Sequence, residues 1–284
     1  MFADRLAALV EERRSQIVLG LDPDPSRLWQ VAVGAESLDE AITAHCRAVI
    51  EATASACVAV KLQLACFERL GSSGWVALEN TVAAARDYGL LVLADGKRGD
   101  VPVTAEAYAQ GLVGETPTPF GPVPGLGADA FTANPLLGRD ALAPLLEAAD
   151  ASGAGCFVLV RTSNPGAADI QDLETKDGPV YEALARIVAE LGADRIGDCG
   201  LSSVGAVTGA TRPDLLARLR ELMPNAIFLL PGVGAQGGAV DDLAAAFQPH
   251  PAAGLVSASR SIVDAADAAA AAEEMRRAAW ALAC

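Results

Sequence analysis

The chain has 284 residues, of which 52% are hydrophobic and 20% are charged, so it can bury a sizeable core. Its formal net charge of -15 argues against nonspecific binding to nucleic acid or to an anionic membrane, and an anionic substrate would need a local cluster of positive charge. The amino terminus lacks a signal-peptide apolar segment, no apolar run reaches membrane-spanning length, and the six cysteines form no C-x-x-C pair, so we expect a cytoplasmic protein with reduced thiols.

Strand-like apolar runs alternate with helix-like segments along the whole chain. The runs that predict strands lie at 17–22, 57–62, 90–97, 128–133, 156–161, 203–208, 226–231 and 253–257. Helical patterning separates them, beginning at 4–15 and ending with an alanine-rich stretch at 264–283. Strict alternation predicts a parallel sheet, and eight strands is the number that closes a (β/α)8 TIM barrel. The weak fourth and sixth runs leave a doubly wound open sheet as the alternative.

The composition shows no break that would mark a second domain. We therefore predict an α/β fold in which residues 1–284 form a single barrel domain. A proline- and glycine-rich stretch at 114–127 predicts an inserted loop near 111–128. The sequence leaves open whether this insert is a mobile lid, a hinge or a fixed decoration.

Polar residues gather where the predicted strands end, which in a barrel is the catalytic rim. Because alternate residues of a strand face the same side, Asp95 and Lys97 should lie side by side at the end of the third strand. Charges at the end of a buried strand are costly unless they are paired or functional. If Asp95 and Lys97 are considered alone, a surface salt bridge at a strand end is a simpler interpretation than a functional site. Convergence on one rim favours an active site, because Asp100 follows just past the third strand and other strand ends contribute Asp22, Lys61, Ser163 and Arg260.

Two segments near the carboxyl terminus predict a phosphate site. The glycine-rich loop at 232–238 leaves backbone N–H groups free to approach an anion. Ser259, Arg260 and Ser261 are expected to open the final helix, so that helix amides and a guanidinium could bind a phosphate. In this fold the loops after the seventh and eighth strands are the usual phosphate position.

Lys61, Asp95, Lys97 and Asp100 predict an array of alternating charge. Such an array can press a carboxylate against a substrate anion while an ammonium stays beside a developing carbanion. A protonated lysine there can stabilise the carbanion and deliver a proton. Since the acids have lysine partners and the chain has only two histidines, we expect no metal site.

Together these residues resemble the orotidine 5'-phosphate decarboxylase family. The segment from Asp95 to Val101, with Thr104, fits the family motif D-x-K-x-x-D-I-x-x-T. The resemblance covers roughly residues 15–264, and the Lys-Arg-Gly-Asp form with the long insert looks like the longer bacterial subgroup, type 2. The features that reinforce it, in the family's order, are Asp22, Lys61, the Ser-Asn-Pro-Gly-Ala run at 163–167, the Gly-Val-Gly-Ala-Gln-Gly-Gly loop at 232–238 and Arg260.

The resemblance implies a cofactor-independent carboxy-lyase that converts orotidine 5'-monophosphate to UMP and CO2, the last step of de novo pyrimidine biosynthesis. By position, Lys97 would protonate C6 of the pyrimidine and Asp95 would lie against the substrate carboxylate. Lys61 would bond the ribose hydroxyls and orient Asp95. The active form would be a homodimer in which Asp100 and Thr104 reach the neighbouring subunit's site.

The same resemblance implies a set of substrate-binding residues. Asp22 would bind a ribose hydroxyl, and Ser163 would hydrogen-bond the edge of the pyrimidine. The loop after the seventh strand would close over the phosphate. The residues expected at the phosphate are Gly234, Gln236, Gly237, Ser259 and Arg260.

Two alternatives stay open from the sequence. One is a magnesium-dependent 3-keto-gulonate 6-phosphate decarboxylase of the same superfamily, which would favour an acid where Lys61 stands. The other is a non-catalytic nucleotide-binding barrel. Loss of Lys61, Asp95 or Lys97 would have favoured that second alternative, and all three are present.

Overall fold

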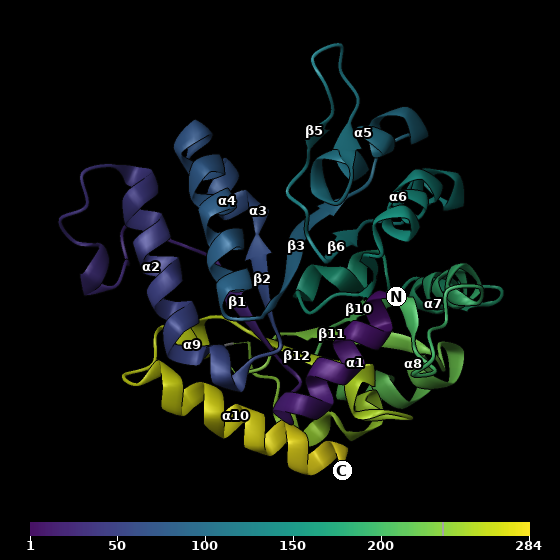
Figure 1. Ribbon diagram of the computed structural model, residues 1–284. Coiled ribbons are helices and arrows are strands. Elements are labelled where there is room, and N and C mark those ends of the chain that lie inside the picture. Colours follow the sequence, from purple (N-terminus) through teal and green to yellow (C-terminus); the bar gives the residue numbers. More distant parts are fainter. Residues whose placement is uncertain (235) are drawn as a thin grey trace.

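Eight parallel strands form a closed barrel at the centre of the molecule, a computed structural model that describes residues 1–234 and 236–284 (Figure 1). The barrel closes between its first and last strands, where Ile17 pairs with Val256. This confirms the predicted TIM barrel, and the open-sheet alternative is wrong. In order around the barrel the strands are β1 (Ile17–Leu21), β2 (Ala59–Gln63), β3 (Leu91–Arg98), β6 (Ala130–Ala133), β7 (Gly155–Arg161), β10 (Ser202–Thr208), β11 (Ala226–Pro231) and β12 (Gly254–Ala258).

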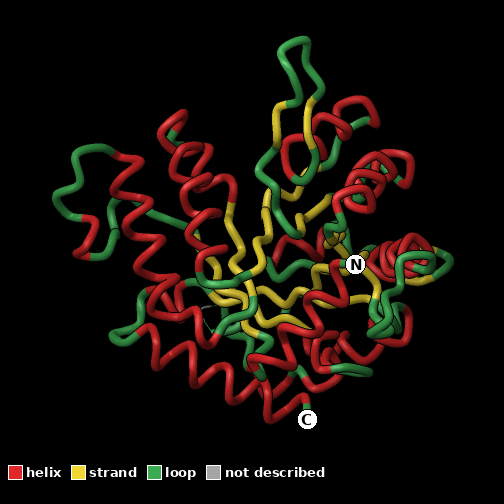
Figure 2. The backbone as a smooth tube through the Cα atoms, in the orientation of Figure 1, coloured by secondary structure: helices red, strands yellow, loops and turns green. Residues whose placement is uncertain are grey.

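Helices surround the strands as an outer layer (Figure 2). Each long helix buries one apolar stripe, as α2 does with Ile42, Cys46 and Val49. Among the described residues, none of these helices is long and apolar enough to cross a membrane. The α-helices are α1 (Phe2–Arg13), α2 (Leu38–Thr53), α3 (Leu64–Glu68), α4 (Gly71–Asp87), α5 (Pro102–Leu112), α6 (Arg139–Ser152), α7 (Val180–Gly192), α8 (Leu216–Leu222), α9 (Arg260–Val263) and α10 (Ala268–Ala283).

The proline- and glycine-rich insert forms a two-stranded hairpin of β4 (Glu115–Thr116) and β5 (Val123–Pro124), which projects beyond α5 in Figure 1. The hairpin is tied to α5 by a 2.8 Å hydrogen bond from the Leu126 amide to the Gly111 carbonyl. A second hairpin joins β8 (Glu174–Thr175) and β9 (Gly178–Pro179) after β7. Short 3-10 helices complete the connections: η1 (Gln30–Ala32), η2 (Ala54–Ala56), η3 (Pro165–Asp169), η4 (Pro213–Leu215), η5 (Val240–Asp242), η6 (Ala244–Phe247) and η7 (Pro251–Ala253).

Helix α1 packs against the amino-terminal end of the barrel. The ring of Phe2 meets the ring of Phe157 edge to face, with 6.0 Å between their centroids. Gly155 permits this contact, because a Cβ atom at that position would overlap the Phe2 ring. This end of the barrel is therefore filled with apolar side chains, and the polar residues at the strand ends face the opposite, carboxyl-terminal mouth.

The carboxyl-terminal segment differs from its prediction. The sequence predicts one helix over 264–283, opened by Ser259, Arg260 and Ser261. Instead, those residues begin the four-residue helix α9, and α10 starts separately. The carboxylate of Asp267 accepts a 2.9 Å hydrogen bond from the Ala270 amide, and this N-cap begins a new helix. The prediction that 259–261 open the final helix is therefore wrong.

Candidate active site

A cavity of about 410 Å³ lies at the carboxyl ends of the barrel strands. It is formed by strand ends that are far apart in sequence, as the TIM-barrel fold predicts. The predicted site residues that line it are Asp22, Lys61, Asp95, Lys97, Ser163, Gln236, Ser259 and Arg260.

Asp95 is the centre of a chain of alternating charges. Its carboxylate is buried and lies between two lysines, with Lys61 Nζ 2.9 Å from Oδ2 and Lys97 Nζ 2.7 Å from Oδ1. Lys61 Nζ also lies 3.8 Å from Asp22 Oδ1. Three members of the array predicted from the sequence, Lys61, Asp95 and Lys97, are thus in contact, and Asp22 joins them through Lys61.

Burial and ion pairing have opposite effects on the pKa values of Asp95 and Lys61. Burial alone raises the pKa of Asp95, but the charges and hydrogen bonds of Lys61 and Lys97 outweigh it and lower the pKa to about 2. For Lys61, burial lowers the pKa, while Asp95 and Asp22 raise it above its ordinary value in total. Asp95 is therefore ionised and Lys61 protonated at neutral pH.

Thr132 is a site residue that the sequence alone does not indicate. It lies on β6, is 1% exposed, and its hydroxyl donates a 2.9 Å hydrogen bond to Asp95 Oδ1. The same hydroxyl accepts a 2.8 Å hydrogen bond from the Lys97 amide. Lys97 has a φ of 48°, which is uncommon outside glycine. The available signal was a polar residue near the end of a predicted strand.

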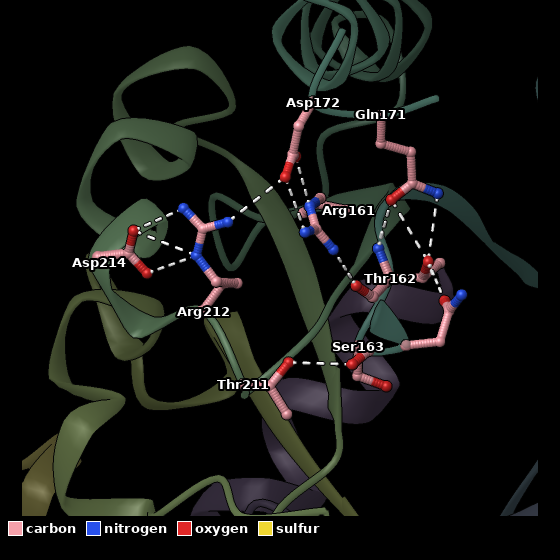
Figure 3. A network of polar contacts seen from close by, with 9 residues as sticks. Arg161, Thr162, Ser163, Gln171, Asp172, Thr211, Arg212 and Asp214 are labelled. Atoms are coloured by element: carbon pink, nitrogen blue, oxygen red, sulfur yellow. Dashed lines mark hydrogen bonds and ion pairs between the residues drawn. The ribbon is translucent and has the colours of Figure 1, made fainter. Parts of the chain in front are cut away.

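Ser163 lies in the loop that follows β7 (Figure 3). The carbonyl of Ser163 accepts a 3.2 Å hydrogen bond from the hydroxyl of Thr211, which follows β10. Its neighbours Thr162 and Asn164, at the same predicted strand end, also line the cavity, and so does Gln171, which the sequence does not indicate.

The phosphate end predicted from the sequence lies between the loops after β11 and β12. Gln236 and Arg260 line the cavity, but Gly234 and Gly237 do not line it within the described residues. Those two glycines have φ values of 73° and 91°, so they permit the tight turn that the loop makes. Ala235, in the middle of the glycine-rich motif, lies outside the described residues.

Asp100 and Thr104 lie next to the site but do not line its cavity within the described part of the chain. Asp100 Oδ1 accepts a 2.8 Å hydrogen bond from the Val101 amide, just before α5. Thr104 lies in the first turn of α5. Asp100, the fourth member of the predicted charge array, is thus not in the cavity with Lys61, Asp95 and Lys97 among the described residues.

A closed barrel with paired charges at its carboxyl mouth defines the class of TIM-barrel proteins whose active site is built from strand ends. A model of the family described as Orotidine 5'-phosphate decarboxylase / HUMPS family matches residues 15–275. The chain belongs to this family.

Individual proteins agree with this assignment. The orotidine 5'-phosphate decarboxylase of Rhodopirellula baltica is 41% identical over 268 residues, which cover 92% of this chain and 88% of that protein. The enzyme of the same name from Deinococcus radiodurans is 44% identical over 263 residues, with the same coverage. The solved structure of Leishmania donovani OMP decarboxylase superposes with a TM-score of 0.76 at 33% identity and covers 98% of each chain.

Proposed function

We propose that this protein decarboxylates orotidine 5'-monophosphate to UMP and CO2 in de novo pyrimidine biosynthesis. Family membership and relatives at about 40% identity, all named for this activity, support the proposal. The structural observation that supports it most is the buried Asp95 carboxylate held between Lys61 and Lys97.

The charged array suits a reaction that passes through a carbanion. The ionised Asp95 lies against the substrate carboxylate and destabilises it relative to the transition state. The bond from C6 to the carboxylate breaks, CO2 leaves, and its electron pair stays on C6. Lys97 Nζ then gives a proton to C6 and is reprotonated from water. Lys61 stabilises the Asp95 charge, and Thr132 orients the same carboxylate.

Binding extends from the ribose to the phosphate. Asp22 and Lys61 meet the ribose hydroxyls, and Ser163 donates to or accepts from the edge of the pyrimidine. Gln236 and Arg260 bind the phosphate with the help of Ser259 and the turn that Gly234 and Gly237 permit. This end is remote from C6, so phosphate binding contributes by closing the loop and aligning the charged residues.

We further propose that the active form is a homodimer in which Asp100 and Thr104 complete the neighbouring subunit's site. Their position outside the cavity of their own chain supports this. Exposed apolar side chains lie in the neighbouring segments: Val103, next to Thr104 on α5, is 82% exposed, and Leu136, in the loop after β6, is 79% exposed. Apolar residues of this kind are common in the contacts of permanent dimers.

The first test is to follow the absorbance of orotidine 5'-monophosphate with purified protein in excess EDTA. Loss of absorbance with UMP as product is the expected result. Lys97→Ala is the matched control, because it removes the proton donor and leaves the barrel core intact. A kcat for this variant within about tenfold of wild type, or ~1.4 kcal/mol, would refute the role of Lys97. Turnover of a sugar-phosphate acid only, restored by magnesium, would indicate the metal-dependent relative instead.

A further inference from the structure

The loop that contains Ser163 is fixed by contacts with its neighbours in the loop and with residues that follow β10. The amide of Thr162 donates a 2.8 Å hydrogen bond to Gln171 Oε1, and Thr211 donates to the Ser163 carbonyl at 3.2 Å. Gly209, at the end of β10, approaches so closely that a Cβ there would lie 2.7 Å from the Ser163 Cα. The position of Ser163 therefore depends on the loop after β7 and on the loop after β10.

These two loops are joined by a chain of ion pairs (Figure 3). Arg161, the buried last residue of β7, donates to both carboxylate oxygens of Asp172 at 2.7 and 3.0 Å. Arg212, after β10, contacts the same carboxylate at 3.5 Å and also pairs with Asp214 at 2.7 Å. Asp172, in the loop after β7, is thus shared by the last residue of β7 and an arginine of the loop after β10. We call Arg161, Asp172, Arg212 and Asp214 the ion-pair chain.

The ion-pair chain reaches Ser163 through its immediate neighbours. Arg161 donates a 2.5 Å hydrogen bond to the carbonyl of Thr162, one residue before Ser163. Arg212 follows Thr211, whose hydroxyl supports the Ser163 carbonyl. The hydrogen bond from Arg161, opposed in part by burial, lowers the pKa of Asp172, so this carboxylate stays charged at neutral pH.

We propose that Asp172 is a positioning residue for base recognition: by joining Arg161 to Arg212, it fixes Ser163 where Ser163 meets the pyrimidine edge. In the described part of the chain, no member of the ion-pair chain lines the cavity, so the effect must pass through the loop. The inference rests on the proposed function, in which Ser163 contacts the base. It predicts that the ion-pair chain controls preference for a pyrimidine nucleotide over a sugar phosphate without a base.

The test is calorimetric binding of two ligands, UMP and ribose 5-phosphate, which share the ribose and the phosphate. Asp172→Asn should weaken UMP binding by about tenfold and change ribose 5-phosphate binding by less than about twofold. Because this variant leaves Arg161 buried without its partner and could fail to fold, Arg212→Gln provides a second route. It cuts the same connection at a half-exposed residue and should weaken UMP binding by about threefold.

Two controls separate positioning from general stability. Asp150→Asn removes the acid of another bidentate arginine pair, with Arg195, away from the cavity, and should leave the UMP to ribose 5-phosphate ratio unchanged. In a Ser163→Ala background, Asp172→Asn or Arg212→Gln should add no further loss of UMP affinity.

Three results would overturn the inference. The first is that Asp172→Asn weakens the binding of UMP and of ribose 5-phosphate equally, and the second is that Arg212→Gln leaves the UMP affinity unchanged. The third is that either variant loses as much UMP affinity in the Ser163→Ala background as in the wild type. Failure of the proposed function is a separate result. A wild-type protein that binds UMP but does not decarboxylate orotidine 5'-monophosphate would reject the activity, while the two ligands would still test base recognition.

Discussion

The Thr132 hydroxyl contacts both members of the proposed catalytic pair. It donates to Asp95 and accepts from the Lys97 amide, so one side chain fixes the carboxylate and the backbone beside it. The pairing of β3 with β6 shifts register between Ala94 and Arg98, where Lys97 adopts its positive φ. At this irregularity the Lys97 amide donates its hydrogen bond to the Thr132 hydroxyl. We therefore expect it to matter for catalysis more than for substrate binding.

Thr132→Val keeps the shape of the side chain but removes the hydroxyl. We expect kcat to fall by about 10- to 150-fold, because a hydrogen bond to a charged group contributes about 1.5–3 kcal/mol. KM should stay within about twofold, since Thr132 acts on Asp95 rather than on the ribose or phosphate. Thr132→Ser, which keeps the hydroxyl, should retain most of the wild-type kcat. Equal rates for the valine and serine variants in steady-state assays would contradict the orienting role.

Single residues differ in how well the sequence predicts them. Asp95 and Lys97 were predictable because alternation along a strand places them side by side, and their contact is observed. Thr132 was not, because its contact depends on the register between β3 and β6 and on a local irregularity. Arg161 and Asp172 were not predicted as a pair, because a loop conformation brings them together.

At the scale of elements, Arg220 on α8 connects several segments at the amino-terminal end of the barrel. Its guanidinium donates to the carbonyls of Ala226, Ala246 and Ala253 at 2.6, 2.7 and 3.1 Å. It also lies over the Phe228 ring, 3.8 Å from the centroid. Burial lowers the pKa of Arg220 to about 9, so it stays protonated at neutral pH. One side chain therefore satisfies carbonyls at the starts of β11 and β12.

Arg220→Lys should lower the free energy of unfolding by about 2–3 kcal/mol, because a single ammonium cannot reach carbonyls spread around a planar guanidinium. The measurement is chemical denaturation at neutral pH. The kcat should not change, since Arg220 lies at the end of the barrel opposite the cavity. Arg277→Lys is the control: Arg277 is exposed and pairs with Glu273, so its loss should stay within about 0.5 kcal/mol. Equal stability of the two variants would contradict this role of Arg220.

The main elements were predicted well because hydrophobic periodicity determines them. The runs at 128–133 and 203–208 appeared weak in the sequence, yet they form β6 and β10 because barrel closure requires strands at those positions. The break between α9 and α10 was missed, because the alanine-rich pattern continues through the Asp267 cap. The hairpin at 114–127 was missed as well, since its two strands have only two residues each.

At the scale of the whole molecule, the site residues divide into two groups. One group lies on or just after β1, β2, β3, β7, β11 and β12 and lines the cavity. Among the described residues, Asp100 and Thr104 lie outside it, as do the turn glycines Gly234 and Gly237. Asp100 lies only three residues after Lys97, so it is close to the mouth of the cavity although it does not line it. When two chains pack with these mouths adjacent, the Asp100 side chain of each chain could approach the other chain's mouth from outside. The exposed side chains of Val101, Val103 and Leu137, at 53%, 82% and 51%, offer an apolar surface for that contact.

Complementation between inactive variants tests this arrangement. Lys97→Ala and Asp100→Ala should each be inactive alone. When they are mixed and allowed to exchange subunits, a mixed dimer has one site with Lys97 from one chain and Asp100 from the other, so activity should recover to about a quarter of wild type. A mixture of Lys97→Ala with Asp95→Ala should stay inactive, because both residues belong to the same chain's site and no intact site can form. If subunit exchange is demonstrated and the first mixture remains as inactive as the second, Asp100 does not act across a dimer.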